Sequence, residues 1–156
     1  DWIPFKKEFI ETSNGEAEVF FIDNNYPLKI IAEIPEGLTL WFGAKEVIPN
    51  ATLSLGEVPS KISKNEGIIL YSEQIINNKN PLETLKELED KGVESKRILI
   101  ISSICSDKGL NKIAKEYPNQ VIYTSCIDKE YESGNSLIPG IGNPILRLST
   151  MFKEKN

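Results

Sequence analysis

The chain has 156 residues, of which 40% are hydrophobic and 26% charged, and its formal net charge is −5. This length and composition fit one globular domain over residues 1–156. The excess of acid argues against a nucleic-acid partner, because phosphates attract clustered Lys and Arg. There is no histidine, which excludes Ser-His and Cys-His nucleophiles and most transition-metal sites. No apolar run approaches the ~20 residues that span a bilayer, and no signal peptide is visible.

The first third of the chain predicts strands followed by a helix. Residues 1–10 are amphipathic and are expected to be irregular, whereas 16–22 follow a Ser-Asn-Gly turn signal and predict a hairpin or edge strand. Residues 28–34 are almost continuously apolar, which is typical of a strand buried on both faces. Apolar residues at helical spacing predict a helix over 37–48, with Trp41 as a core or interface anchor.

The middle of the chain predicts two short strands and a second helix. The strands are 51–55 and 67–71, and the second of these is wholly apolar. A polar loop over 72–80 follows it. The next helix begins at Pro81, where the missing N–H costs nothing, and it ends at Gly92. Three leucines in this helix are expected to face the core: Leu82, Leu85 and Leu88.

The last third continues the same alternation. Residues 97–104 predict a strand, and a helix capped by Ser106 or Asp107 runs to Tyr117, with Leu110, Ile113 and Ala114 turned inward. Residues 120–125 predict the final strand, and a Pro-Gly loop occupies 138–142. The two cysteines, Cys105 and Cys126, are too few for a disulfide framework or a zinc site. Both follow apolar runs and are expected to be buried, reduced thiols.

Strands alternate with helices from residue 28 to residue 125, which predicts a parallel, right-handed α/β sheet flanked by helices. In such a sheet, ligands bind in loops at the carboxyl ends of the strands. Loop 72–80 stands at the position of a phosphate cradle, but it contains no glycine. Two interpretations remain open for it, a residual anion site that uses Lys79 and a solvated polar loop, and the second is favoured.

An acidic run follows the last predicted strand. Asp128, Lys129, Glu130 and Glu132 could offer carboxylates to a metal ion. Such a run is more often a solvated surface, and this is the interpretation we favour.

Residues 123–128, Tyr-Thr-Ser-Cys-Ile-Asp, and 138–142, Ile-Pro-Gly-Ile-Gly, resemble the C-terminal half of uracil phosphoribosyltransferases. The similarity extends backwards over nearly the whole chain, although the N-terminal helical segment of the family is missing. The resemblance implies the type I phosphoribosyltransferase fold, with a parallel, Rossmann-like sheet. It also implies that main-chain groups of the Pro-Gly loop bind uracil, near Leu137, Ile138 and Gly140.

The chain departs from the family at its functional motifs. The phosphoribosyl-diphosphate loop, Asp-Pro-Met-Leu-Ala-Thr-Gly-Gly-Thr in the family, has lost its acid and both glycines; its degenerate form here includes Ser72, Asn77, Asn78, Lys79 and Asn80. The Leu-Arg-Ala-Gly motif has become residues 34–37, with Pro35 at the arginine and Glu36 beside it. Residues 56–61 lack a second arginine, and 142–147 lack two acids of the family pattern.

These losses lead to the hypothesis of a catalytically inactive relative that serves as a structural or interaction subunit. Two alternatives remain open: an active enzyme that converts uracil and phosphoribosyl diphosphate to UMP, or a residual nucleobase-binding protein. A truncated product that is poorly soluble without a partner is a third.

We expect no catalytic residues, no resident metal, and no cofactor unless activity persists, in which case Mg²⁺ is needed. Expected partners are proteins, in a homodimer or a heteromeric complex, with the helix bearing Trp41 and Phe42 as a contact surface. The expected compartment is the cytoplasm or the plastid stroma.

Overall fold

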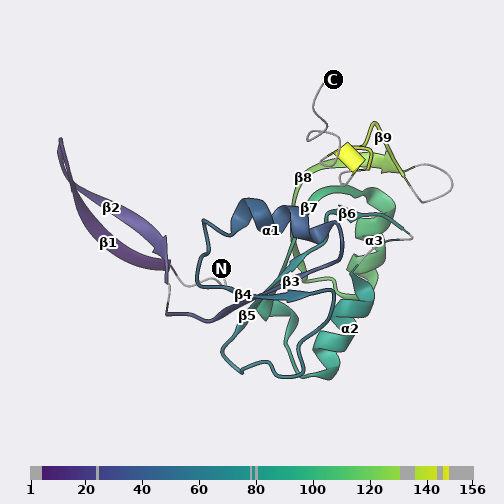
Figure 1. The fold of residues 1–156 in the computed structure, drawn as a ribbon, viewed down its shortest axis with the longest axis horizontal. Helices are drawn as coiled ribbons and strands as arrows, with labels where there is room; N and C mark the ends of the chain where they lie inside the picture. Colours follow the sequence, from purple (N-terminus) through teal and green to yellow (C-terminus); the bar gives the residue numbers. More distant parts are fainter. Residues whose placement is uncertain are drawn as a thin grey trace, which may run out of the picture.

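The computed structural model describes residues 5–23, 25–77, 79, 81–130, 136–143 and 146–147. Figure 1 shows a main body built on one sheet and a separate two-stranded arm that projects from it. The helices and strands, in chain order, are β1 (Phe5–Thr12), β2 (Gly15–Ile22), β3 (Leu28–Ala32), α1 (Gly37–Ala44), β4 (Thr52–Leu55), β5 (Gly67–Tyr71), β6 (Gln74–Ile75), α2 (Leu82–Asp90), the 3-10 turn η1 (Ser95–Arg97), β7 (Ile98–Ser106), α3 (Asp107–Glu116), β8 (Val121–Glu130) and β9 (Leu137–Ile138).

The main sheet has the strand order β4-β3-β5-β7-β8-β9, and β6 pairs with the end of β7. Strands β4, β3, β5, β7 and β8 are parallel to their neighbours, and the short β9 is antiparallel to β8. The predicted parallel α/β fold is therefore confirmed. Strand β5 is buried along its whole length, as its apolar sequence predicts.

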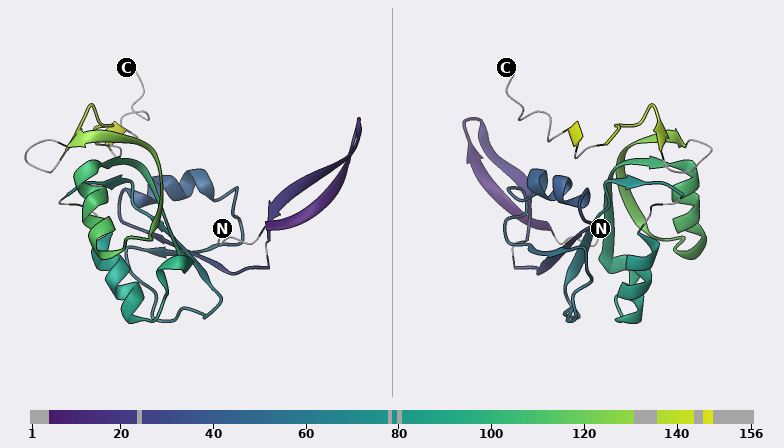
Figure 2. Two further views of the ribbon diagram at one scale, coloured as in Figure 1. Left: turned by 180° about the vertical axis from the view of Figure 1, so that it is seen from behind. Right: turned by 45° about the vertical axis from the view of Figure 1, so that its right-hand side comes forward.

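The helices form a layer on each face of the sheet. Helix α1 lies on one face, and α2 and α3 lie on the other (Figure 2). From β3 the chain passes to β4 on one side, and then to β5 on the other side of β3. The crevice between the carboxyl ends of β3 and β5 is thus a topological switch point, which is where ligands bind in open α/β sheets.

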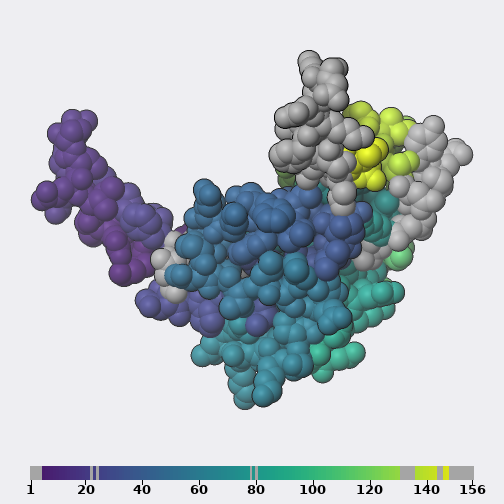
Figure 3. Space-filling view, viewed as in Figure 1, coloured from purple at the N-terminus to yellow at the C-terminus, as the bar shows by residue number. Residues whose placement is uncertain are grey.

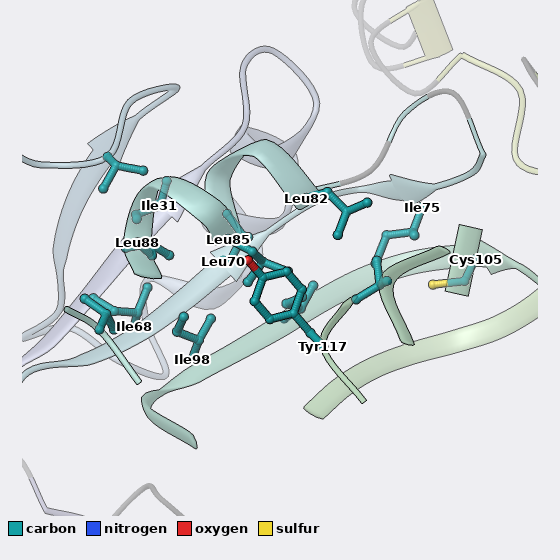
Figure 4. Packing of buried hydrophobic residues seen from close by; sticks show 14 residues of the cluster. Ile31, Ile68, Leu70, Ile75, Leu82, Leu85, Leu88, Ile98, Cys105 and Tyr117 are labelled. Carbon is teal, nitrogen blue, oxygen red and sulfur yellow. The ribbon is translucent and has the colours of Figure 1, made fainter. Parts of the chain in front are cut away.

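The larger core lies beneath α2 and α3. The predicted inward leucines of α2 are confirmed: Leu85 and Leu88 are fully buried and Leu82 nearly so. They pack against apolar side chains of β5 and β7, with the Tyr117 ring at the end of α3 (Figure 4). Burial of a leucine side chain contributes about 1.5–3 kcal/mol, so this face of the sheet carries much of the stability of the fold.

The projecting arm corrects the expectation for the N-terminus. Residues 5–10 belong to strand β1, which pairs antiparallel with β2 from Phe5↔Ile22 to Thr12↔Gly15, so the predicted irregular segment is wrong and the predicted hairpin is confirmed. Four aromatic side chains of the arm are about half exposed or more: Phe5, Phe9, Phe20 and Phe21. Figure 3 shows the arm standing clear of the main body.

Several predicted boundaries are also wrong. Helix α1 ends at Ala44, and 45–48 form turns, because the residue before Pro49 disfavours the helical conformation. Strand β8 runs five residues past its predicted end, to Glu130. Ala114 is exposed, since α3 turns Gly109 and Ile113 to the core. Cys105 is buried as expected, whereas Cys126 is exposed on β8.

Within the described part of the chain, no helix combines the length and the apolar character needed to cross a membrane.

Candidate functional site

The crevice between β3 and β5 is lined by charged side chains of both signs. Glu33 follows β3, and Ser72 and Glu73 follow β5. An open groove of about 690 Å³ adjoins this position, and its lining residues come from the strand ends, α2 and α3: Glu33, Ile34, Gly56, Lys79, Leu82, Glu83, Lys86, Lys112 and Glu116. The position agrees with the one that the sequence predicts for a ligand site.

Three carboxylates surround the switch point. Glu73 is 4% exposed, and its Oε1 accepts a hydrogen bond from the Thr39 hydroxyl of α1 at 3.0 Å. Its Oε2 is buried and has no hydrogen-bond partner among the described residues. Glu36 forms an ion pair with Lys79, with 2.7 Å between Nζ and Oε1. Because Glu33 also stands here, the crevice holds more negative than positive charge.

The pKa values of these carboxylates follow from their surroundings. Burial raises the pKa of Glu73, and Glu36 raises it further, while the Thr39 hydroxyl and Lys79 oppose this. Burial also raises the pKa of Glu33 above its ordinary value of 4.5. Burial acts on Glu36 in the same direction, but its contact with Lys79 outweighs it, so the pKa of Glu36 is lowered. Burial therefore disfavours the charged form of Glu33 and Glu73 relative to an exposed carboxyl, and Lys79 offsets only part of this effect.

The degenerate phosphate loop is folded inward and is not the solvated loop that the sequence suggests. Ser72 is fully buried, and Ile75 and Ile76 belong to the two cores beside β7. Asn77 and Lys79 are half-buried. Asn78 and Asn80 lie outside the described residues.

The backbone amides of this loop donate to groups of the protein itself. Ile76 and Lys79 exchange hydrogen bonds, with N···O distances of 2.8 and 3.2 Å, so the loop closes on itself in a tight turn. The Asn77 N–H donates to Glu130 Oε2 of β8 at 3.0 Å, and the Ser72 N–H donates to the Ile101 carbonyl at 3.1 Å. A phosphate cradle needs several N–H groups that converge on open space, and these N–H groups do not converge.

The lysines of the groove are also engaged. Lys79 pairs with Glu36, and Lys86 pairs with Glu116 at 2.9 Å. Lys112 donates from Nζ to the Asn77 carbonyl at 3.0 Å. A polyanion that entered the groove would have to replace these contacts.

The Pro-Gly loop lies beside the degenerate phosphate loop. Leu137 is buried against Ile76 and Ile104, whereas Ile138 is about half exposed. The Gly140 N–H donates to Asp128 Oδ2 at 2.8 Å. Gly140 has a φ of +62°, and a Cβ there would lie 2.7 Å from the Leu137 carbonyl oxygen, so only glycine fits this turn.

The carbonyls that follow in the Pro-Gly loop accept hydrogen bonds as well. Gln74 Nε2, from β6, donates to the Gly142 carbonyl at 3.1 Å, and Arg147 donates to the Ile141 carbonyl at 3.0 Å. The structure therefore brings the Pro-Gly loop and the degenerate phosphate loop together and joins them through Gln74. The residues named for the nucleobase pocket, Leu137, Ile138 and Gly140, sit at this junction.

Two residues of the acidic run have roles that the sequence analysis missed. Asp128 and Glu130 are half-buried rather than solvated, and each accepts a backbone N–H from one of the two loops. They stand two residues apart on β8, so their side chains share one face of the strand. Extending the period-two pattern beyond residue 125 would have shown this shared face.

The metal interpretation of the same run has no counterpart in the described residues. They contain no group of three His, Cys, Asp or Glu side chains arranged to hold a metal ion. Glu132 lies outside the described residues.

Comparisons with known proteins identify one matching family and several similar proteins. The family model described as uracil phosphoribosyltransferase matches residues 46–144. The uracil phosphoribosyltransferase of Synechococcus elongatus is 23% identical over 159 residues, which cover 92% of this chain and 73% of that protein. The chloroplastic uracil phosphoribosyltransferase of Arabidopsis thaliana is 24% identical, covering 92% of this chain and 54% of that protein. A solved structure of a protein from Aquifex aeolicus matches the fold with a TM-score of 0.66 at 18% identity, covering 90% of this chain and 73% of that chain.

Proposed function

The chain belongs to the uracil phosphoribosyltransferase family, and from that premise we propose that it is a catalytically inactive member, kept as a structural or interaction subunit of a larger assembly. The observation that carries the proposal is the inward-folded phosphate loop. Its Ile76, Asn77 and Lys79 amides donate to groups of the chain itself. Phosphoribosyl transfer needs a diphosphate held in place while positive charge develops on the ribose, so positioning and electrostatics supply most of the catalysis.

The charges at the crevice support the same conclusion. Glu33, Glu36 and Glu73 stand around the switch point, and Pro35 occupies the place of the family's arginine. Loss of one charge-assisted contact to a developing charge costs roughly 2–4 kcal/mol in the barrier. Here several contacts are lost together, and carboxylates that repel a polyanion are added.

Magnesium enters the chemistry of the family together with the diphosphate. The described residues contain no group of three His, Cys, Asp or Glu side chains that could hold the ion without the diphosphate. No step of the proposal therefore passes through a metal ion.

A residual nucleobase site at the Pro-Gly loop is the second candidate, since the chain keeps the Pro-Gly sequence of the family at 138–142. Gly140 retains its positive φ, and Leu137 is buried beneath it. The Gly140 N–H already donates to Asp128, however, and a base that uses this donor must displace the carboxylate. An active enzyme, as the names of the relatives suggest, is the third candidate.

The proposed partners are proteins, either a second copy or another chain. On α1, Trp41 packs against the core, whereas Phe42 is 61% exposed, with the Lys45 ammonium 5.7 Å from its ring centroid, and it presents apolar surface for a partner. The chloroplastic and cyanobacterial relatives are consistent with a plastid stroma or a bacterial cytoplasm.

The decisive experiment measures activity and binding in parallel. We expect no release of pyrophosphate with uracil, phosphoribosyl diphosphate and Mg²⁺, and no heat of binding for phosphoribosyl diphosphate. The Synechococcus elongatus relative, assayed in the same way, is the positive control. Formation of UMP, or tight binding of the diphosphate, would overturn the proposed inactivity. Uracil binding alone would support the second candidate.

Analytical ultracentrifugation of the native complex then tests the subunit role, which a free monomer would contradict.

A further inference from the structure

Glu130, at the end of β8, accepts a backbone hydrogen bond from the degenerate phosphate loop. Its Oε2 accepts the Asn77 N–H at 3.0 Å, and it also accepts a hydrogen bond from the Ser106 hydroxyl. Lys112 reaches the same turn of the loop, with its Nζ 3.0 Å from the Asn77 carbonyl. A backbone N–H and a hydroxyl therefore meet at one carboxylate oxygen, while the Lys112 ammonium group binds the carbonyl of Asn77, the same residue whose N–H the carboxylate accepts.

The position of this carboxylate is fixed by the sheet. Glu130 pairs with Leu137 of β9, and two residues earlier Asp128 pairs with Ser106 of β7. The side chain therefore reaches the loop from an anchored strand. Ser106 is fully buried and also caps α3 by accepting the Gly109 N–H at 2.9 Å.

The two carboxylate oxygens of Glu130 differ in their hydrogen bonding. Oε1 is buried and has no hydrogen-bond partner among the described residues. Leaving one carboxylate oxygen unpaired is unfavourable, so the contacts of Oε2 must hold the side chain in place. Donors that hold a carboxylate in this way suit other oxyanions too, because phosphate offers the same negatively charged acceptor oxygens.

We propose that Glu130 is an internal competitor for an oxyanion: it occupies the Asn77 N–H and the Ser106 hydroxyl, which would otherwise contact an inorganic phosphate or a phosphomonoester. The contact is autoinhibitory, since the chain excludes phosphate with its own carboxylate and not only through the loss of glycines. This inference rests on the proposed function, because it assumes that the unaltered chain does not bind phosphate at this loop.

The test compares phosphate binding in three variants and the unaltered chain. Glu130→Ala removes the competitor, and Glu130→Gln keeps a neutral acceptor of the same shape. Glu83→Gln makes the same change of charge on an exposed side chain that lines the groove. The probe is inorganic phosphate, titrated to about 10 mM at constant ionic strength, with the melting temperature as the first readout. The second readout is the amide chemical shifts of Asn77 and Gly109.

We expect at least about tenfold tighter phosphate binding in Glu130→Ala than in the unaltered chain or Glu83→Gln, because an uncompensated carboxylate no longer faces the anion. Glu130→Gln should lie in between. The changes in amide chemical shift on addition of phosphate should be confined to Asn77, Gly109 and their neighbours.

Three outcomes would overturn the inference. The first is a folded Glu130→Ala that binds phosphate no better than the unaltered chain. The second is an equal increase in phosphate affinity in Glu130→Ala and Glu83→Gln, which would show that the loss of any negative charge near the groove has the same effect. If Glu130→Ala does not fold, the comparison uses Glu130→Gln instead. The third outcome is then a Glu130→Gln variant that binds phosphate no more tightly than Glu83→Gln does. Phosphoribosyl transfer by the unaltered chain would instead refute the proposed function, so the two failures can be told apart.

Discussion

Two regions of the molecule are stabilised by different interactions. One is the core beneath α2 and α3, and the other is the polar edge, the loops at the carboxyl ends of the strands. The core is held by apolar volume, with Leu85 and Leu88 fully buried against β5 and β7. At the polar edge, individual donors and acceptors matter, and there the chain turns its donors toward its own carboxylates, as Asn77 and Gly140 do. The comparison indicates that the hydrophobic pattern is enough to maintain the fold, whereas a binding site needs particular donors and acceptors at particular positions.

The largest expected effect is on the core. Leu85→Ala should lower the free energy of unfolding by about 3–4 kcal/mol, because it leaves a cavity that the surrounding side chains fill only in part. Urea denaturation measures this. Val47→Ala, at a side chain that is 71% exposed, is the control and should change stability by less than about 0.5 kcal/mol. Equal losses in the two variants would contradict the assignment of the core.

An intermediate effect is expected at the polar edge. Asp128→Ala removes the acceptor of the Gly140 N–H and should cost about 1–2 kcal/mol, since it leaves that donor without its charged partner. The Gly140 amide should exchange with solvent faster in the variant. Asp128→Asn keeps an oxygen and should lose less. An unchanged exchange rate at Gly140 would show that Asp128 does not hold the Pro-Gly loop.

The smallest effect concerns pH. The pKa of Glu73 is raised in the folded state, mainly by burial, so its contribution to stability is fully present below the ordinary value of 4.5 and is lost as the pH rises through the raised pKa. The stability of the unaltered chain relative to Glu73→Gln should therefore decrease as the pH rises above 4.5.

The matched control for this pH dependence is Glu94→Gln. Contact with Lys96 lowers the pKa of the exposed Glu94, so the stability of the unaltered chain relative to Glu94→Gln should increase with pH, and this increase should lie below pH 4.5. A difference between the unaltered chain and Glu73→Gln that does not vary with pH would contradict the assigned burial of Glu73.

The parts of the fold that could be predicted from the sequence are those that one local pattern determines. The apolar run of β5 and the leucine spacing of α2 indicate their elements without reference to the rest of the chain. Strand β1 could not be predicted, because its phenylalanines and lysines do not mark a buried face and it exists through pairing with β2.

The candidate site could be predicted in position but not in its contacts. The alternation of strands and helices indicates the carboxyl ends of β3 and β5. That Glu130 would accept the Asn77 N–H depends on where β8 ends relative to a loop 53 residues earlier, and no local pattern encodes that. The burial of Glu73 likewise depends on α1, whose Thr39 covers it.

The β1–β2 arm has a consequence for how the molecule unfolds. Its ladder of hydrogen bonds is local, and an isolated two-stranded hairpin is marginally stable in water. The arm and the main sheet therefore form separate cooperative units, and the arm opens at a much lower free energy than β5 or β7. A single melting temperature describes the main sheet alone, while the state of the arm at any moment depends on what contacts its exposed phenylalanines.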